Sequence, residues 1–459
     1  MTAHRFDPSI LRAYDIRGIL EETLGPEDAV AIGRAFGTIV RRRGGQTVNV
    51  GFDGRHSSPD LADRLTQGLL STGVTVQQIG LGPTPMLYFS VFELGADGGI
   101  MVTGSHNPPN HNGFKFMLDR KGFFGDDIQA LGEMAAAGDF ESGPGSTVVV
   151  DLADRYVDRL VQDADLPTDI TVAWDPGNGA AGAVMRSLAD RLSGRHVLIN
   201  DDVDGDFPNH HPDPTIPENL KQLREVAEKE KANVGFAFDG DGDRVGVIDE
   251  SGRIVWGDQL LALLSRDVLE MSPGATIIGD VKCSIALFDE VRRLGGAPIM
   301  WAAGHSLVKS KMAETGAKLA GEMSAHIFFA DTYYGFDDGL YAAVRTLQLL
   351  QRSGRSMGAL LDELPVFVNT PELRFDCPDD RKFDIAAEVA NRMKAAGADV
   401  VDLDGVRVTT QDGWWLLRAS NTQAVLVARV EARTDDGLER LKSQLFGELT
   451  ASGVEPPTV

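Results

Sequence analysis

The sequence has few cysteines, little positive charge and no long apolar run. Its 459 residues include only Cys283 and Cys377, too few for a disulfide framework. No apolar stretch approaches the roughly 20 residues of a membrane span, and no basic segment followed by an apolar one opens the chain. These absences predict a cytoplasmic protein without a membrane partner, and nothing in the sequence indicates an obligate protein partner.

Basic residues are outnumbered, since 68 acidic residues face 44 lysines and arginines and the formal net charge is -24. Such a field repels nucleic acid, which we therefore exclude as a partner. An anionic substrate would need the few cations to be concentrated at its site. The hydrophobic content of 42% is ordinary for a globular protein with a sizeable core.

Short apolar runs rich in β-branched residues alternate with longer helical patterns along most of the chain. This alternation predicts α/β domains with mixed sheets. The expected strands are 46–53, 98–104, 170–175, 233–239 and 276–281, and the expected helices are 58–73, 181–194 and 284–295. The tail differs, because the runs VRVTT, WWLLRA and AVLVARVEAR are closely spaced strands before a final helix, which is typical of an α+β domain.

Stretches rich in glycine, proline and polar residues at 135–146, 249–257 and 363–373 mark the expected boundaries between domains. They divide the chain into three α/β domains and a smaller C-terminal α+β domain. The predicted domains are 1–147, 148–253, 254–367 and 368–459.

Polar clusters follow several predicted strands, at the strand ends where α/β sheets place ligand sites. The first is TGSHNPPNHNGFK, residues 103–115, which we interpret as one loop. Ser105 follows Gly104, so its hydroxyl can project from a tight turn, while His106 and Lys115 supply positive charge. The alternative for this stretch is a hydrogen-bonded surface turn.

The second cluster is FDGDGDR, residues 238–244, in which Asp239, Asp241 and Asp243 alternate with glycines. Glycine lets the backbone fold so that the carboxylates converge, and a hard divalent cation would relieve their repulsion. An EF-hand is excluded because Arg244 occupies the position that needs glycine and a strand precedes the segment. An acidic solvated turn is the alternative. Arg244 argues against it, because an arginine beside a metal site is expected when an anion binds both the arginine and the metal.

The third cluster is GEMSAH, residues 321–326, whose Glu322 and Ser324 would face hydroxyl groups while His326 donates to an anion. A helix N-cap explains this segment equally well. His305 opens a helix-like stretch and is either the start of that helix or a proton carrier. Arg17 precedes a glycine near the N-terminus.

The fourth cluster is RASNT, residues 418–422, after another predicted strand. The guanidinium of Arg418 can donate two parallel hydrogen bonds to one phosphate, and Ser420, Asn421 and Thr422 offer further donors. The alternative is a hairpin turn. Together the four clusters are the inventory for phosphoryl transfer to and from a phosphorylated polyol.

TGSHNPP…NGFK, DGDGDR, GEMSAH and RASNT, in this order and at these separations, resemble the motifs of the α-D-phosphohexomutase superfamily over the whole chain. The sequence is most similar to bacterial phosphomannomutase/phosphoglucomutase, because Met323 stands where phosphoglucosamine mutases carry glutamine. The resemblance implies four domains around a central cleft, three of them related α/β domains and the last a smaller α+β domain.

The resemblance also implies an isomerase that moves a phosphoryl group between C1 and C6 of glucose or mannose phosphates. It implies a phosphoserine enzyme, a 1,6-bisphosphate intermediate, one Mg²⁺ per active site and glucose 1,6-bisphosphate as activator. Ser105, Asp239, Asp241 and Asp243 would bind the metal. Arg17, His106, Lys115 and Arg244 would surround the reacting phosphoryl group, with Lys115 and His305 as candidates for proton transfer. The implied substrate contacts are Tyr14, Lys282, Glu322, Ser324, His326, Arg418, Ser420, Asn421 and Thr422.

The sequence departs from the family pattern at Ala325, where glycine is usual. The added methyl group is expected to narrow the range of backbone conformations open to the sugar-binding segment. Three other functions use similar residues. Phosphoglucosamine mutase is the alternative substrate assignment, a metal-dependent sugar phosphatase would pass the phosphoryl group to water, and a sugar-phosphate sensor would bind without reaction. The sensor would be expected to lack the nucleophile or a metal carboxylate, and both are present.

Overall fold

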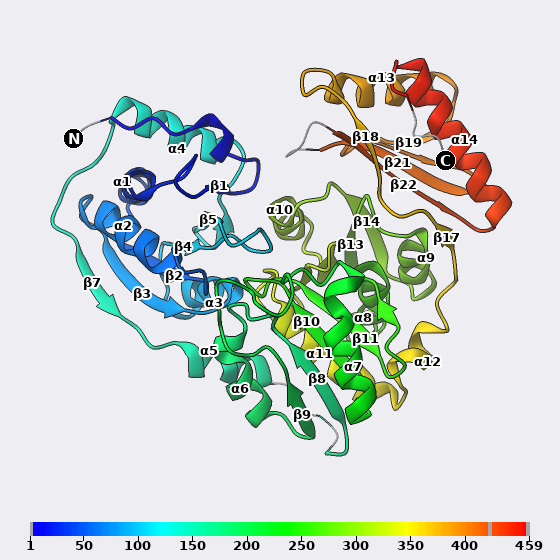
Figure 1. The fold of residues 1–459 in the computed structure, drawn as a ribbon, viewed down its shortest axis with the longest axis horizontal. Helices are drawn as coiled ribbons and strands as arrows, with labels where there is room; N and C mark the ends of the chain where they lie inside the picture. Colours follow the sequence, from blue (N-terminus) through cyan, green and yellow to red (C-terminus); the bar gives the residue numbers. More distant parts are fainter. Residues whose placement is uncertain (1–2, 163, 165, 167, 421–424, 456–459) are drawn as a thin grey trace.

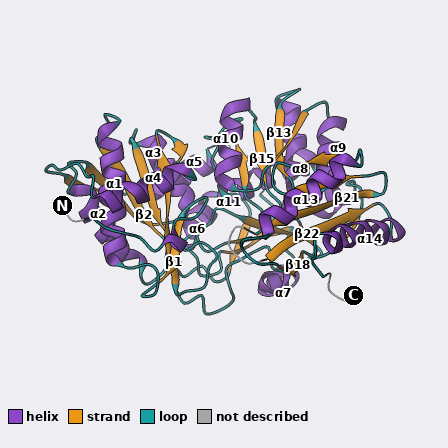
Figure 2. Cartoon of the chain, turned by 90° about the horizontal axis from the view of Figure 1, so that it is seen from above, coloured by secondary structure: helices purple, strands orange, loops and turns teal. Residues whose placement is uncertain are grey.

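A computed structural model describes residues 3–162, 164, 166, 168–420 and 425–455, which fold into four sheets with covering helices (Figure 1). In Figure 2 the strands lie between layers of helices, as expected for α/β domains. No helix within these described ranges is long and apolar enough to cross a membrane. The expected strands and helices of the sequence are all present within a few residues.

The first sheet has the strand order β1-β5-β4-β2-β3-β7, with β6 paired to β5. Helices α1, α2 and α4 pack on one face of it, and α3 packs on the other. Its elements are β1 (Ile16–Ile19), α1 (Pro26–Arg42), β2 (Thr47–Phe52), α2 (Ser58–Leu70), β3 (Thr75–Leu81), α3 (Thr84–Glu93), β4 (Gly98–Val102), β5 (His111–Leu118), β6 (Lys121–Gly122), α4 (Asp126–Ala137) and β7 (Ser146–Val149).

The second sheet has the order β12-β11-β10-β8-β9, with parallel pairing around β8 and an antiparallel pair, β10 and β11, beyond it. Its elements are α5 (Ala153–Val161), β8 (Thr171–Asp175), α6 (Gly182–Arg191), β9 (Arg195–Leu198), α7 (Lys221–Glu230), β10 (Val234–Phe238), β11 (Val245–Asp249) and β12 (Ile254–Val255).

The third sheet has the order β14-β13-β15-β16. Its elements are α8 (Gly257–Met271), β13 (Thr276–Asp280), α9 (Ile285–Arg293), β14 (Ala297–Trp301), α10 (His305–Thr315), β15 (Leu319–Gly321), β16 (Ile327–Phe329), α11 (Gly339–Ser353) and α12 (Met357–Leu361).

The last sheet is antiparallel in every pair, with the order β17-β22-β21-β20-β19 and β18 also paired to β22. Its elements are β17 (Val368–Asn369), β18 (Leu373–Asp376), α13 (Lys382–Ala395), β19 (Asp399–Val401), β20 (Val406–Thr409), β21 (Gly413–Ala419), β22 (Val425–Ala432) and α14 (Asp435–Ala451). This agrees with the α+β character expected of the tail.

One apolar core runs through the first three sheets, a second lies between the first sheet and helices α1, α2 and α4, and the last sheet and its two helices bury a core of their own. The predicted boundary at 147/148 falls inside β7, and the one at 253/254 falls just before β12, which pairs within the second sheet. The exact domain limits therefore stay predictions.

Helices α1 and α2 cross at glycines, which makes their packing sensitive to one added methyl group. A Cβ at Gly33 would lie 2.2 Å from the carbonyl oxygen of Leu65, and one at Gly68 would lie 2.2 Å from that of Val30. We expect Gly33→Ala to lower the free energy of unfolding by about 1–3 kcal/mol, as overpacked cores do, measured by chemical denaturation.

Gly447 in α14 is the matched control, because it is exposed and a Cβ there would meet no atom within 4 Å. Gly447→Ala should raise the unfolding free energy by up to about 1 kcal/mol, since alanine is the better helix former. Equal effects of the two substitutions would contradict the close helix crossing.

Candidate active site

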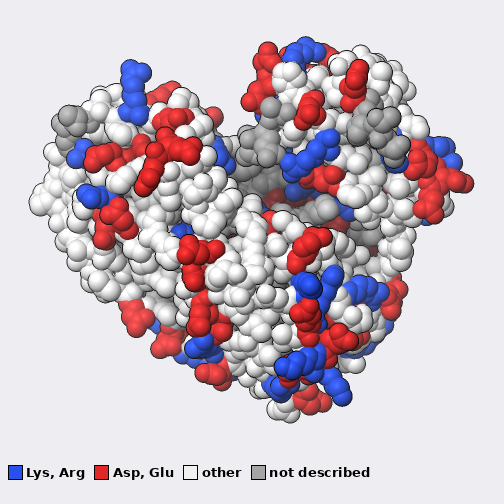
Figure 3. All heavy atoms as spheres, in the orientation of Figure 1, with Lys and Arg blue, Asp and Glu red and all other residues white. Residues whose placement is uncertain are grey.

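The site forms where loops from three sheets meet in the central cleft. Ser105 follows β4, residues 239–244 follow β10, and residues 322–326 follow β15. These loops and the N-terminal segment line a cavity of about 420 Å³. Figure 3 shows the molecule hollowed between its N-terminal and C-terminal lobes, with lysine and arginine side chains beside the opening.

Ser105 is only 2% exposed, so the alternative of a surface turn is wrong for Ser105, although residues 108–110 of the same stretch are exposed. Its φ of 50° lies in the left-handed region, which glycine enters freely but which other residues, asparagine and aspartate apart, rarely enter. Its hydroxyl donates to Asp239 Oδ2 at 3.1 Å and lies 3.2 Å from His106 Nδ1. The charge of Arg244, together with burial, holds the pKa of His106 well below its usual value, so that imidazole is neutral.

Asp239, Asp241 and Asp243 have no exposed surface, and one oxygen of each lies within 4.8 Å of the others. The alternative of a solvated acidic turn is therefore wrong. The Oδ1 atom of Asp241 accepts no hydrogen bond. Buried, convergent carboxylate oxygens with an unused acceptor fit a hard divalent cation. Burial, together with repulsion from Asp243 and Asp241, raises the pKa of Asp239 well above its ordinary value.

Glycines between these aspartates are required by close contacts. A Cβ at Gly240 would lie 2.3 Å from the carbonyl oxygen of Ser105, and Gly242 has a φ of 75°. The alternation of aspartate and glycine in the sequence therefore serves two purposes. It turns the carboxylates inward, and it lets the Ser105 loop approach them.

Lys115 does not belong to the loop in which the sequence analysis placed it. Residues His111–Leu118 form β5, antiparallel to β4, so the strand returns Lys115 beneath Ser105. Its Nζ lies 2.6 Å from Asp241 Oδ2 and 2.5 Å from Asp243 Oδ2. Burial disfavours the ammonium, but the two carboxylates outweigh burial and raise the pKa of Lys115 well above its usual value.

Residues 321–326 form the turn between β15 and β16, so the alternative of a helix N-cap is wrong. Glu322 accepts a hydrogen bond from the Gly304 amide at 2.6 Å and lies 3.0 Å from His326 Nδ1. Ala325 has a φ of 71°, which explains why glycine is favoured at this position. Burial opposes the charged form of His326, but Asp243 and Glu322 outweigh it and raise the pKa of the imidazole to about 9.

His305 begins α10, and its Nδ1 lies 3.3 Å from Asp337 Oδ2. Lys309 Nζ lies 2.7 Å from the other oxygen of the same carboxylate. Burial and the Lys309 cation lower the pKa of His305, although Asp337 opposes this. The lowered pKa favours the neutral imidazole of His305.

The N-terminal segment closes the cavity from the other side. Arg17 donates to the side chains of Asp15 and Asn107, and Tyr14 donates to the carbonyl oxygen of Ala303 at 2.9 Å. Burial raises the pKa of Tyr14 to about 12, so its phenol stays neutral.

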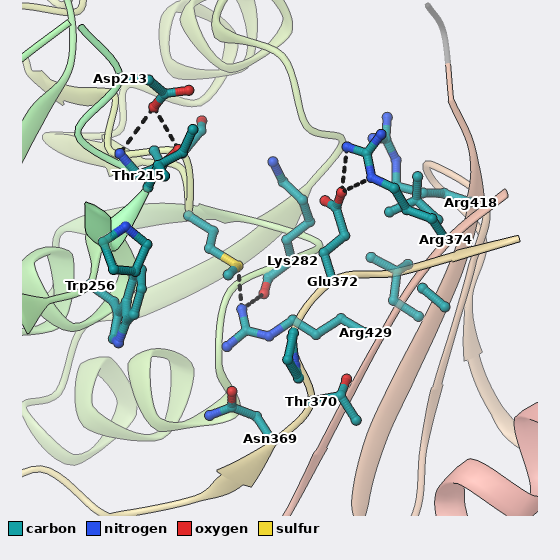
Figure 4. A pocket seen from close by; sticks show the side chains of 18 residues that line it. Asp213, Thr215, Trp256, Lys282, Asn369, Thr370, Glu372, Arg374, Arg418 and Arg429 are labelled. Carbon is teal, nitrogen blue, oxygen red and sulfur yellow. Dashed lines mark hydrogen bonds and ion pairs between the residues drawn. The ribbon is translucent and has the colours of Figure 1, made fainter. Parts of the chain in front are cut away.

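A second cavity of about 790 Å³ lies between the third and last sheets (Figure 4). Lys282, Ser324 and Arg418 line it. Arg418 is held by Asp404, 3.1 Å from its Nη2. The turn of residues 321–326 lies between the two cavities, since Ser324 lines one and His326 the other.

The structure thus divides the predicted residues into two groups. Around the Ser105 cavity it brings together Tyr14, Arg17, His106, Lys115, Arg244, His305 and His326. Glu322 lies buried beneath His326. Ser420 is buried at the end of β21, where its amide donates to the Val425 carbonyl at 3.0 Å, and Asn421 and Thr422 lie outside the described residues.

Sequence reasoning missed several residues that support this site. Thr84, at the start of α3, donates to Asp241 Oδ2 at 2.5 Å, and Asp337 orients His305. Arg429 donates to the Lys282 carbonyl at 2.8 Å in the second cavity (Figure 4).

Arg55 donates to the backbone of the Ser105 loop. Of these, Arg55 carries a usable signal, because it follows a predicted strand directly.

Family models match in four consecutive parts of the chain. They are phosphoglucomutase/phosphomannomutase alpha/beta/alpha domain I over residues 8–141, domain II over 154–252, domain III over 256–367, and the C-terminal domain over 372–448.

Whole-chain relatives agree with these matches. A phosphomannomutase/phosphoglucomutase of Pseudomonas aeruginosa is 45% identical, covering 96% of each chain, and a phosphoglucomutase of Neisseria gonorrhoeae is 41% identical, covering 95% of each. The crystal structure of a phosphoglucomutase/phosphomannomutase family protein from Burkholderia thailandensis superposes with a TM-score of 0.94 at 45% identity, covering 99% of this chain and 100% of the other. The chain belongs to the phosphoglucomutase/phosphomannomutase family.

Proposed function

We propose that the protein interconverts hexose 1-phosphates and hexose 6-phosphates through a phosphoserine at position 105. The observation that carries the proposal is the contact of the buried Ser105 hydroxyl with a cluster of three carboxylates. The second cavity, with Lys282 and Arg418, supports it further, because a mutase must hold one phosphate while the other reacts. Relatives named phosphomannomutase/phosphoglucomutase match 96% of this chain at 45% identity, which also supports the proposal.

In the proposed reaction, phosphorylated Ser105 donates its phosphoryl group to the free hydroxyl of the sugar phosphate. The bond between phosphorus and Oγ breaks, a bond to O1 or O6 forms, and His305 accepts the hydroxyl proton. The resulting 1,6-bisphosphate reorients, and the Ser105 oxygen, which the first transfer leaves without a proton, attacks the other phosphorus. The bond between that phosphorus and its sugar oxygen breaks, and the sugar oxygen takes the proton back from His305. Reversal of the bisphosphate explains why the Arg418 site must accept either phosphate.

The other charged residues have positioning roles in this proposal. Arg17, His106 and Arg244 surround the reacting group, and Lys115 balances the aspartates. Glu322, Ser324 and His326 would contact sugar hydroxyls. Asp239, Asp241 and Asp243, with an oxygen of phosphorylated Ser105, would hold one Mg²⁺, which supplies charge neutralisation during transfer. We place the reaction in the cytoplasm, with glucose 1,6-bisphosphate as the activator.

The direct test supplies the protein with glucose 1-phosphate, Mg²⁺ and a trace of glucose 1,6-bisphosphate. Glucose 6-phosphate, followed through a coupled dehydrogenase, should accumulate without release of inorganic phosphate. Mannose 1-phosphate and glucosamine 1-phosphate are compared in parallel. Faster turnover of glucosamine 1-phosphate would favour the phosphoglucosamine assignment, and stoichiometric phosphate release would favour a phosphatase.

A further inference from the structure

Arg55 follows β2, is 1% exposed, and lies directly beneath the loop that carries Ser105. A guanidinium has five N–H donors, and here each has an acceptor. One contact, from Nε, is to Asp53 Oδ2 at 3.2 Å. The other four are to backbone carbonyls of the loop, those of Ser105 at 2.7 Å, Asn107 at 2.6 Å, Pro108 at 2.6 Å and His111 at 3.1 Å.

Asp53 holds the same loop from its other end. Its Oδ2 accepts from the Thr103 hydroxyl at 2.8 Å and from the Gly104 amide at 3.2 Å. Its Oδ1 accepts from the amide of Arg55 at 3.0 Å and from the hydroxyl of Ser58 at 2.5 Å. The Asp53–Arg55 pair therefore holds the loop from residue 103 to residue 111 mainly by its backbone, with the Thr103 hydroxyl as the one side-chain contact among those named here.

This arrangement matters because Ser105 is held in a backbone conformation that it does not favour. A left-handed φ is strained for a residue with a Cβ, and such strain persists only where surrounding contacts determine it. The Ser105 carbonyl is the atom that the left-handed turn redirects, and it points to Arg55 Nη2. With the carbonyl fixed by Arg55, the Ser105 hydroxyl donates to Asp239.

We propose that Arg55 is a positioning residue for the nucleophile, holding Ser105 Oγ toward the carboxylate cluster in both its free and its phosphorylated form. Arg55 does not line either cavity, so it acts through the loop and not on the substrate. The inference rests on the proposed nucleophilic role of Ser105.

Lysine at position 55 keeps the charge but offers a single ammonium in place of a planar group with five donors. We expect Arg55→Lys to lower kcat by roughly 100-fold, the cost typical of a 1 Å misplacement of a reacting group. The KM for glucose 1-phosphate should stay at the wild-type value, because the substrate contacts are unchanged. Phosphorylation of the dephosphorylated enzyme by glucose 1,6-bisphosphate, followed by intact mass, should slow by the same factor.

Arg345→Lys is the matched control, since Arg345 is equally buried but pairs with Asp267 at 3.0 Å and Asp331 at 2.8 Å away from both cavities. It should lower the melting temperature and leave kcat of the folded protein unchanged. Asp53→Asn is a second variant should Arg55→Lys fold poorly, and it should show the same loss of kcat at constant KM.

A purely structural role for Arg55 predicts a lower melting temperature with normal phosphorylation of the folded enzyme, and that result would overturn the inference. The proposed function would survive that result if the wild-type protein turns over glucose 1-phosphate and the Ser105→Ala variant does not. Recovery of Arg55→Ala by millimolar guanidinium ion, without recovery by methylammonium, would support the positioning role directly.

Discussion

Replacing Ser105 with alanine is expected to reduce turnover of glucose 1-phosphate by roughly 10⁴-fold or more, the scale seen when a covalent nucleophile is removed. The reason is that Ser105 Oγ is the hydroxyl that lies between Asp239 and His106. Binding should survive, because Lys282 and Arg418 line a separate cavity and do not contact Ser105. The measurements are the coupled assay, the dissociation constant for glucose 1-phosphate, and intact mass after incubation with glucose 1,6-bisphosphate.

The wild-type protein should gain the mass of one phosphoryl group and Ser105→Ala none. Ser443→Ala is the control, since Ser443 is exposed on α14 and donates to the Glu439 carbonyl of its own helix. Persistent turnover in Ser105→Ala would show that the phosphoryl group passes directly between substrates or through another residue. In that event Ser105 would not be the nucleophile, and its contact with Asp239 would serve substrate or metal binding alone.

The location of this site could be predicted from the sequence because its residues lie just after predicted strands. Asp239 comes directly after an apolar run and Ser105 three residues after another, and the carboxyl ends of strands are where α/β sheets gather ligands. The convergence of the three aspartates was equally predictable, since only alternating glycines let consecutive carboxylates face one point. Local sequence is sufficient for both features because each is set within a few residues.

Lys115 shows where local reasoning fails. Asn112 and Gly113 favour turns, so the segment reads as a continuation of the preceding loop, yet it pairs with both β1 and β4. Gly113 is required there, because a Cβ would lie 2.2 Å from the Ile16 carbonyl oxygen of the neighbouring strand. The residue that breaks the strand pattern in sequence is the one that makes the strand fit, and only the tertiary pairing shows this.

The division of the predicted residues between two cavities was also beyond the sequence. Lys282 and Arg418 belong to different sheets, and their approach depends on how the last domain packs on the third. Arg407, for example, is buried on Trp414 and donates to the carbonyls of Val281 and Cys283, on either side of Lys282. No periodicity or motif encodes such a contact between distant segments.

Removal of Mg²⁺, or loss of one metal carboxylate, is the second change expected to have a large effect. Three buried carboxylates face the ammonium of Lys115, which contacts two of them. Their mutual repulsion at short range in a buried site favours binding of a further cation. Chelation should therefore abolish turnover, and added Mg²⁺ should restore it. Asp241→Asn should lower kcat at least 100-fold, in line with loss of transition-state charge stabilisation.

Stability gives a readout of the same site that does not depend on turnover. Mg²⁺ at a hundredfold excess over its dissociation constant should stabilise the wild-type protein by about 2.7 kcal/mol, because only the folded chain assembles the three carboxylates. Asp241→Asn should lose most of this gain in a thermal titration with MgCl₂. Asp63→Asn, at an exposed position on α2, should keep it. An equal response of both variants to Mg²⁺ would mean that the cation binds elsewhere, and the carboxylate cluster would then be neutralised by Lys115 alone.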